Sequence, residues 1–211
     1  MAKERLEKIQ RTKSVGKSPE VAESPKPRIT AFVGPRGKDT FGEHGKLFSN
    51  EAQTEYVDQR GREPAISAVN ELDKVSRDYY DCTGLAAIGL NRDGKKISFF
   101  LTHQRTGNPE DFRDQLIARL QQFKRSVQPG KFDIVIFGGK YHKNPKSEGP
   151  FAKKFERRNE SYEESVAALK ELAVDTLGVE PRIVEDTTAE GTYFNVKLET
   201  AGERLYIIYR D

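Results

Sequence analysis

Short apolar runs separated by polar or glycine-rich breaks mark the second half of the chain. Residues 83–90 are almost all apolar, residues 91–94 read Asn-Arg-Asp-Gly, and residues 96–103 are rich in β-branched and aromatic side chains. Two such runs joined by a turn that contains Asp-Gly predict a β-hairpin. The same pattern predicts further strands at residues 28–33, 132–137, 182–185, 192–198 and 204–209.

Helical spacing of apolar residues first occurs in the segment 63–78. Ile66, Val69 and Leu72 recur every three residues there, and Pro64 suits the first turn of a helix. The segment therefore predicts a helix that precedes the hairpin.

Two longer helices are predicted beyond the hairpin. The first begins at Asn108 and Pro109, which suit a helix cap and a first helical position, and keeps one apolar face up to Phe123. Pro129 and Gly130 are expected to end it. The second runs through residues 161–177 and ends at Gly178. Strands outnumber helices and many connections are short. We therefore expect an α+β fold in which two main helices pack on a mostly antiparallel sheet or sandwich.

Composition divides the chain into an arm and one domain. Residues 1–27 contain few large apolar side chains and many Ser, Pro and Lys, so we expect a disordered basic N-terminal arm. Residues 28–211 are expected to form a single α+β domain of catalytic type. Within it, residues 140–158 hold seven Lys and Arg against two Glu, and we expect a basic loop there.

Charge and cysteine content narrow the possible functions. The 211 residues include 36 Lys and Arg against 33 Asp and Glu, for a net charge of +3, with one Cys and three His. This balance makes nucleic acid an unlikely partner, and a single Cys excludes an intrachain disulfide and a cysteine-rich zinc module. No stretch of about 18 apolar residues exists, so no membrane span is expected. Without an apolar leader, a cytoplasmic location is expected, and secretion as an effector stays open.

Cys82 and His103 are the candidate catalytic residues. If the hairpin turn centres on Arg92 and Asp93, opposed residues have numbers that sum to about 185, and Cys82 then lies opposite His103. An imidazole at that distance favours the thiolate, which is the nucleophile. The same two residues also fit a small buried cysteine and a surface histidine.

From Cys82 onward the order of elements resembles the CheD-like and cytotoxic-necrotizing-factor-like superfamily of glutamine deamidases, over about residues 75–210. In that superfamily a Cys opens one strand, a His ends the next, and a helix follows. Asp81 departs from the small residues usual before the Cys, and the Cys-to-His separation of 21 residues is longer than usual. The receptor substrate of CheD is therefore not carried over. The later matches are Phe137-Gly138-Gly139, Arg158-Asn159, Gly178, Glu185-Asp186 and Gly191.

The resemblance implies a cysteine-dependent protein glutamine deamidase. His103 would deprotonate Cys82, the thiolate would attack a glutamine amide, and water would resolve the thioester; an amine in place of water would make the same site a transglutaminase. No metal or organic cofactor is implied, and the partner is a protein that carries an accessible glutamine. The possible third catalytic residues are Gln104, Thr83, Asp81 and Ser76, and the residues expected at the substrate are Gly138, Gly139, Lys140 and Tyr141.

Two other functions stay open. Asp81-Cys82 and His103 also resemble part of the multicopper-oxidase-like family of purine-nucleoside enzymes, with His44 as a third zinc ligand, although the Gly-Trp-Arg-Gly segment of that family is absent. Alternatively, the basic loop 140–158 with its aromatic residues could serve a non-catalytic module that binds nucleic acid or an acidic protein surface. His142 in that loop is expected to be structural or exposed.

Overall fold

The computed structural model describes residues 25–33, 53–57, 65–79, 82–105, 113–139, 150–186 and 193–210. The elements in these ranges are β1 (Thr30–Val33), β2 (Thr54–Tyr56), β3 (Ala65–Ile66), β4 (Asp73–Tyr79), β5 (Cys82–Asn91), β6 (Lys96–Arg105), α2 (Arg113–Ser126), β7 (Val127–Gly139), α3 (Pro150–Leu177), β8 (Arg182–Asp186), β9 (Tyr193–Glu199) and β10 (Arg204–Arg210).

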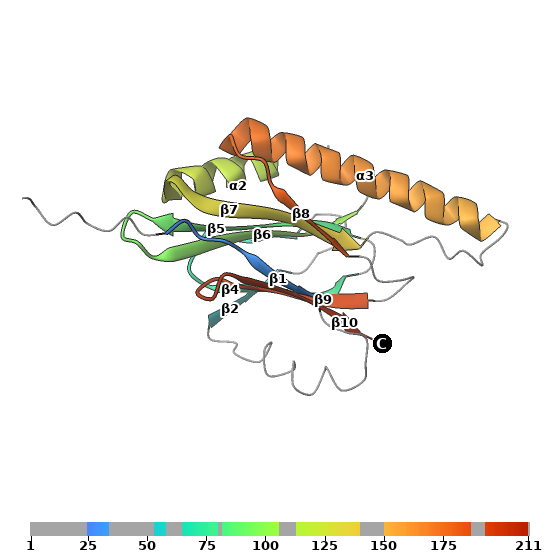
Figure 1. Cartoon of the computed structure of the whole chain (residues 1–211), viewed down its shortest axis with the longest axis horizontal. Helices are drawn as coiled ribbons and strands as arrows, with labels where there is room; N and C mark the ends of the chain where they lie inside the picture. The colour runs from blue at the N-terminus through green and yellow to red at the C-terminus, as the bar shows by residue number, and fades with distance from the viewer. Residues whose placement is uncertain are drawn as a thin grey trace, which may run out of the picture.

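The strands form two five-stranded sheets that lie face to face. The central sheet has the order β3-β6-β5-β7-β8, and the outer sheet has the order β1-β10-β9-β4-β2. Both helices cover the face of the central sheet that is turned away from the outer sheet, which makes three layers (Figure 1). Most strand pairs are antiparallel, and β1–β10, β2–β4 and β7–β8 are parallel. The α+β class expected from the sequence is confirmed.

Strand β5 explains why one stretch of the sequence is apolar without alternation. Leu85 and Ala87 are buried in the core beneath the helices, whereas Ala86 and Ile88 are buried in the core between the sheets. A strand that is covered on both faces gains from apolar residues at every position. The hairpin that joins β5 to β6 was predicted correctly, and its turn lies at residues 91–95.

The two helices bury the apolar faces that their spacing predicted. Helix α2 buries Leu116, Leu120 and Phe123, and Gly178, with φ of +75°, follows the last residue of α3. Its N–H donates to the carbonyl of Val174 at 2.8 Å, which is the left-handed glycine end expected from the sequence.

The prediction of a helix over 63–78 is wrong. Residues Ala65–Ile66 pair with β6, and Asp73–Tyr79 form a strand between β9 and β2. Leu72, which the helical pattern placed inward, is 38% exposed. Lys74 and Val75 of β4 are paired on both sides, and this long-range hydrogen bonding overrides a local three-residue spacing.

Two boundaries also differ from the sequence predictions. Helix α3 begins at Pro150, so the second half of the predicted basic loop is helical. Pro129 and Gly130 lie inside β7 and do not end the preceding helix, which stops at Ser126. Residues 1–24 of the predicted arm lie outside the described residues, while Pro27 and Ile29 are already buried. In the part of the chain that the structure describes, no helix is long and apolar enough to cross a membrane.

Candidate functional site

Four strands bring most of the predicted site residues to one end of the central sheet. Thr83 of β5 pairs with Gln104 of β6 on one side and with Gly138 of β7 on the other. Gly138 in turn pairs with Glu185 of β8, so these four residues form one row across the sheet. A neighbouring row contains the pair Cys82–Arg105 and the pair Gly139–Asp186.

The register places Cys82 opposite Arg105, so the predicted pairing of Cys82 with His103 is wrong by two positions. One position comes from the turn: Leu90 pairs with Lys96, so opposed numbers sum to 186 near the turn. The other comes from a register shift between Thr83 and Leu85. A local turn pattern cannot reveal such an irregularity, because its cost and benefit depend on the neighbouring strands.

His103 belongs to the irregular part of β6. Thr83 pairs with Gln104 and Leu85 pairs with Leu101, so the two residues 102 and 103 face the single residue Gly84. This count of two against one defines a β-bulge, a feature that is common beside active sites because it redirects a side chain. Cys82 and His103 thus share one end of the β5–β6 ribbon, two positions out of register. Their side chains lie outside the described ones.

The candidates for a third residue are divided between the two sheets. Thr83 is fully buried and continues the series Leu85, Ala87 that lies beneath the helices. Ser76 is fully buried in β4 and pairs with Val196 of the outer sheet, and its Oγ has no hydrogen-bond partner among the described residues. Asp81, Lys140 and Tyr141 lie outside the described residues, as does the side chain of Gln104.

Arg105 is the residue at this end that the sequence reasoning missed. It is the Cα partner of Cys82, and a guanidinium beside a thiol favours the thiolate. The only sequence signal for this pairing is the length of the turn. A three-residue loop at 92–94 would have moved the predicted register one step toward Arg105.

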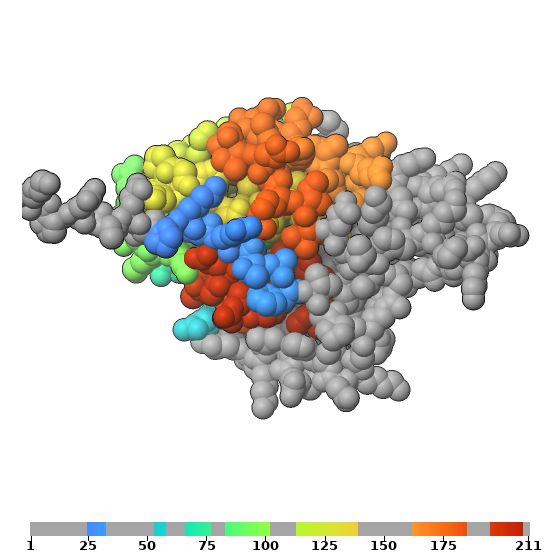
Figure 2. Space-filling model, viewed as in Figure 1, coloured from blue at the N-terminus to red at the C-terminus, as the bar shows by residue number. Residues whose placement is uncertain are grey.

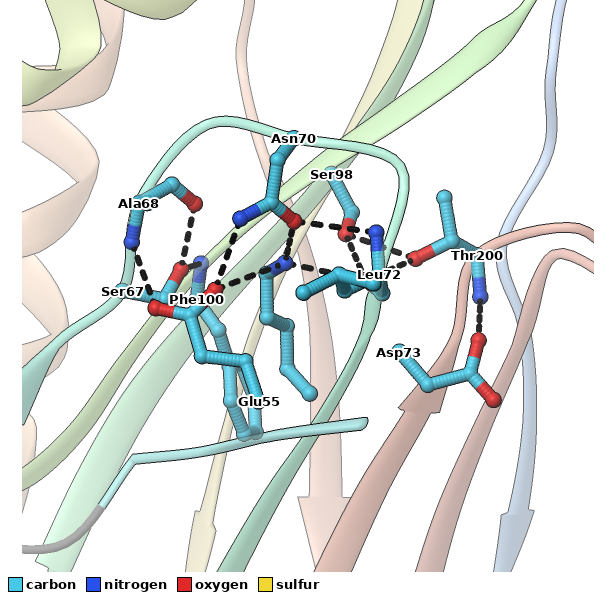
Figure 3. Close-up of polar contacts among 10 residues, drawn as sticks. Glu55, Ser67, Ala68, Asn70, Leu72, Asp73, Ser98, Phe100 and Thr200 are labelled. Carbon is cyan, nitrogen blue, oxygen red and sulfur yellow. Dashed lines mark hydrogen bonds and ion pairs between the residues drawn. The ribbon is translucent and has the colours of Figure 1, made fainter. Parts of the chain in front are cut away.

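A separate buried polar cluster surrounds Lys74 of β4, and Figure 3 shows its partners Glu55, Asn70 and Leu72. The Lys74 side chain is 0% exposed, and its Nζ lies 3.0 Å from Glu55 Oε2. The ammonium also donates to the Leu72 carbonyl at 2.9 Å and to Asn70 Oδ1. Burial lowers the pKa of Lys74, and the charge of Glu55 opposes this shift in part.

Glu55 receives two further hydrogen bonds within this cluster. The N–H of Ala68 donates to Oε1 at 2.8 Å and the Asn70 amide donates to Oε2 at 3.0 Å. Partial burial acts to raise the pKa of the Glu55 carboxyl, but these donors and the charge of Lys74 outweigh it, so the pKa is lowered overall. The carboxylate therefore stays ionised and connects β2 to the segment between β3 and β4.

Hydroxyl groups extend the same polar layer to the turn between β9 and β10. Ser98 Oγ lies 2.7 Å from Thr200 Oγ1, and both hydroxyls bind the Leu72 carbonyl. The N–H of Thr200 donates to Asp73 Oδ1 at 2.9 Å (Figure 3). The Lys74 side chain has no exposed surface, and its ammonium contacts Glu55, Asn70 and the Leu72 carbonyl. It is therefore not accessible to a substrate. We interpret the cluster as a structural connection between the two sheets.

No other described feature resembles a reaction centre. A hollow of about 460 Å³ lies at the turn end of the β5–β6 ribbon, opposite to Cys82, and its lining includes both acidic and basic residues. Among the described ranges, no three His, Cys, Asp or Glu side chains are grouped as metal ligands. His44 and His142 lie outside these ranges.

Comparisons with known proteins do not indicate a function for this site. No family model matches the chain, and no curated protein matches its sequence.

Proposed function

We propose that the protein is a cysteine-dependent glutamine deamidase whose reaction centre is formed by Cys82 and His103. The observation that carries the proposal is that the first residue of β5 and the bulge of β6 lie at the same end of one ribbon. Gly138 and Gly139 end the strand on the other side of β5. We expect the substrate amide to lie beside these two glycines.

Strand geometry makes proton transfer between the two residues feasible. A residue and the one two positions from its direct partner lie about 7–8 Å apart, within reach of long or aromatic side chains. The bulge at residues 102–103 changes the direction of β6 at this point. Arg105, opposite Cys82, adds a positive charge that favours the thiolate.

The reaction follows from these two groups. His103 removes the proton from Cys82, and the sulfur forms a bond to the side-chain carbonyl carbon of a glutamine. The C–N bond then breaks, and the nitrogen leaves as ammonia with the proton from His103. Water, deprotonated by His103, attacks the thioester, releasing glutamate and restoring the thiol. Backbone N–H groups near Cys82 would hold the oxyanion.

The order of elements behind Cys82 supports a fold of the CheD-like and cytotoxic-necrotizing-factor-like type. A His-containing strand, a helix, a strand that ends in Phe137-Gly138-Gly139 and a second helix follow in that sequence. A free thiol persists most readily in a reducing compartment, so the proposal favours the cytoplasm.

The first test measures the reactivity of the thiol. Because the chain has one Cys, iodoacetamide labels one site, and the labelling rate against pH gives the pKa of Cys82. We expect a pKa below about 8.5 for the wild type and a higher one for His103→Ala. His142→Ala, the same substitution at a histidine outside the ribbon, should label like the wild type. Equal labelling curves for wild type and His103→Ala would refute the catalytic pair.

The second test measures the reaction. A library of glutamine-containing peptides is incubated with wild type and with Cys82→Ser, and mass spectrometry detects the gain of about 1 Da that amide hydrolysis produces. Ammonia release provides an independent readout. A fluorescent primary amine added to the mixture would be incorporated if transfer competes with hydrolysis. Modification that persists in Cys82→Ser would show that another group is responsible.

A further inference from the structure

We propose that β8 is a dimerisation strand that pairs antiparallel with β8 of a second copy of the chain. The pairing would join two central sheets edge to edge across a twofold axis, with each copy presenting the same surface to the other.

The position and exposure of β8 support this role. It is the last strand of the central sheet and pairs, among the described strands, with β7 alone. Ile183, next to the middle residue Val184, is 43% exposed, and the side chain of Arg182 is 42% exposed. Figure 2 shows residues of β8 on the surface, in orange-red beside the blue residues of β1. An edge strand that pairs with no other described strand on its outer side and carries an exposed apolar residue is suited to adding a strand.

The order of charged residues along β8 favours antiparallel pairing with β8 of a second copy of the chain. The strand reads Arg-Ile-Val-Glu-Asp, with a base at its start and two acids at its end. Antiparallel pairing centred on Val184 places Arg182 opposite the partner's Asp186, and a shift of one residue places it opposite the partner's Glu185. Parallel pairing would instead set like charges side by side, which is unfavourable.

Arg182 can contact the second copy while it keeps its contacts within its own chain. Its Nη2 lies 2.5 Å from Asp133 Oδ2 and 2.7 Å from the Ile29 carbonyl oxygen. A guanidinium has five N–H donors, so the two contacts through one nitrogen leave donors for a partner. The other strand edge on this side, β1, has the sequence Thr-Ala-Phe-Val and offers no charge pairing.

The test is sedimentation velocity of the full chain over a wide concentration range. We expect a concentration-dependent dimer for the wild type, because five residues of strand provide only a small interface. Ile183→Glu places a carboxylate opposite the partner's Glu185 in the pairing centred on Val184 and should weaken dimerisation by about tenfold or more. Val174→Glu is the matched control, since Val174 is 39% exposed on α3, and it should dimerise like the wild type.

A second variant tests the charge pairing itself. The double variant Glu185→Lys with Asp186→Lys places lysines opposite the partner's Arg182, and this like-charge contact should also yield a monomer. Circular dichroism checks that the double variant folds. A wild type that stays monomeric at every concentration would overturn the proposal. So would an Ile183→Glu variant that dimerises normally, or a Val174→Glu variant that loses the dimer.

Discussion

Asp133 of β7 and Arg182 of β8 form an ion pair, with Oδ2 and Nη2 2.5 Å apart, and the same two atoms hold the backbone of Ile29. The N–H of Ile29 donates to Asp133 Oδ2 at 2.8 Å, and the Ile29 carbonyl accepts from Arg182 Nη2 at 2.7 Å. Ile29 directly precedes β1, the edge strand of the outer sheet. The pair therefore connects the edges of the two sheets.

Asp133→Ala should destabilise the protein by about 2 kcal/mol, because it leaves the buried N–H of Ile29 without its acceptor. The free energy of unfolding is measured by urea denaturation. Asp175→Ala, which removes an exposed carboxylate from α3, is the control and should leave the denaturation midpoint unchanged. Equal stability of the two variants would contradict the role of Asp133.

Glu55→Gln should destabilise by about 3 kcal/mol, because it leaves the charge of the fully buried Lys74 without a counter-charge. Glu71→Gln is the matched control, because it removes the charge of a carboxylate in an exposed ion pair. Glu71 pairs with Lys95 at 3.3 Å, but both side chains are more than half exposed, so Glu71→Gln should have no measurable effect. If Glu55→Gln matched Glu71→Gln, the cluster around Lys74 would not stabilise the fold.

The lowered pKa of Glu55 predicts a loss of stability in acid. Between its folded pKa and the ordinary value of 4.5, the unfolded chain binds a proton that the folded protein does not. The free energy of unfolding should therefore fall as the pH drops through this window, and Glu55→Gln should remove that part of the slope. A wild type and a variant with parallel profiles would contradict the assignment.

The pKa of Lys74 is also lowered, which predicts that the free energy of unfolding changes with pH in the alkaline range. Between the folded pKa and the ordinary value of 10.5, the unfolded chain binds the extra proton, so stability contributed by this group rises with pH there. Lys74→Met removes the titrating group and should flatten this part of the profile. The comparison is made by chemical denaturation at a series of pH values, and a profile that keeps its slope in Lys74→Met would assign the effect elsewhere.

Gly89→Ala should destabilise by about 1–3 kcal/mol, because an added Cβ would lie 2.4 Å from Val127 Cγ1 and 3.0 Å from Phe132 Cβ. Val127 is β-branched and has little freedom to move away. The double variant Gly89→Ala with Val127→Ala should recover part of the loss relative to Val127→Ala alone. Additive effects in this double-mutant cycle would show that the two residues do not compete for space.

The sequence placed the candidate residues at one end of the central sheet but gave the wrong register for Cys82 and His103. Cys82, His103, Gly138 and Gly139 do come to one end of the central sheet, as the order of apolar runs and turns suggested. The direct partner of Cys82 is Arg105, because the turn has three residues and β6 contains a bulge opposite Gly84. The turn length is a local feature, whereas the bulge depends on how β6 pairs with its neighbouring strands, which a local pattern does not contain.

The sequence by itself determined the hairpin, the apolar faces of two helices, the glycine that ends α3 and the α+β class, because these depend on interactions within a few residues or on simple periodicity. The tertiary structure decided that residues 73–79 are a strand, that β7 and β8 are parallel, and that Lys74 is buried. These features depend on contacts between distant segments, whose free energy exceeds the local preferences and is not encoded in any short stretch of the chain.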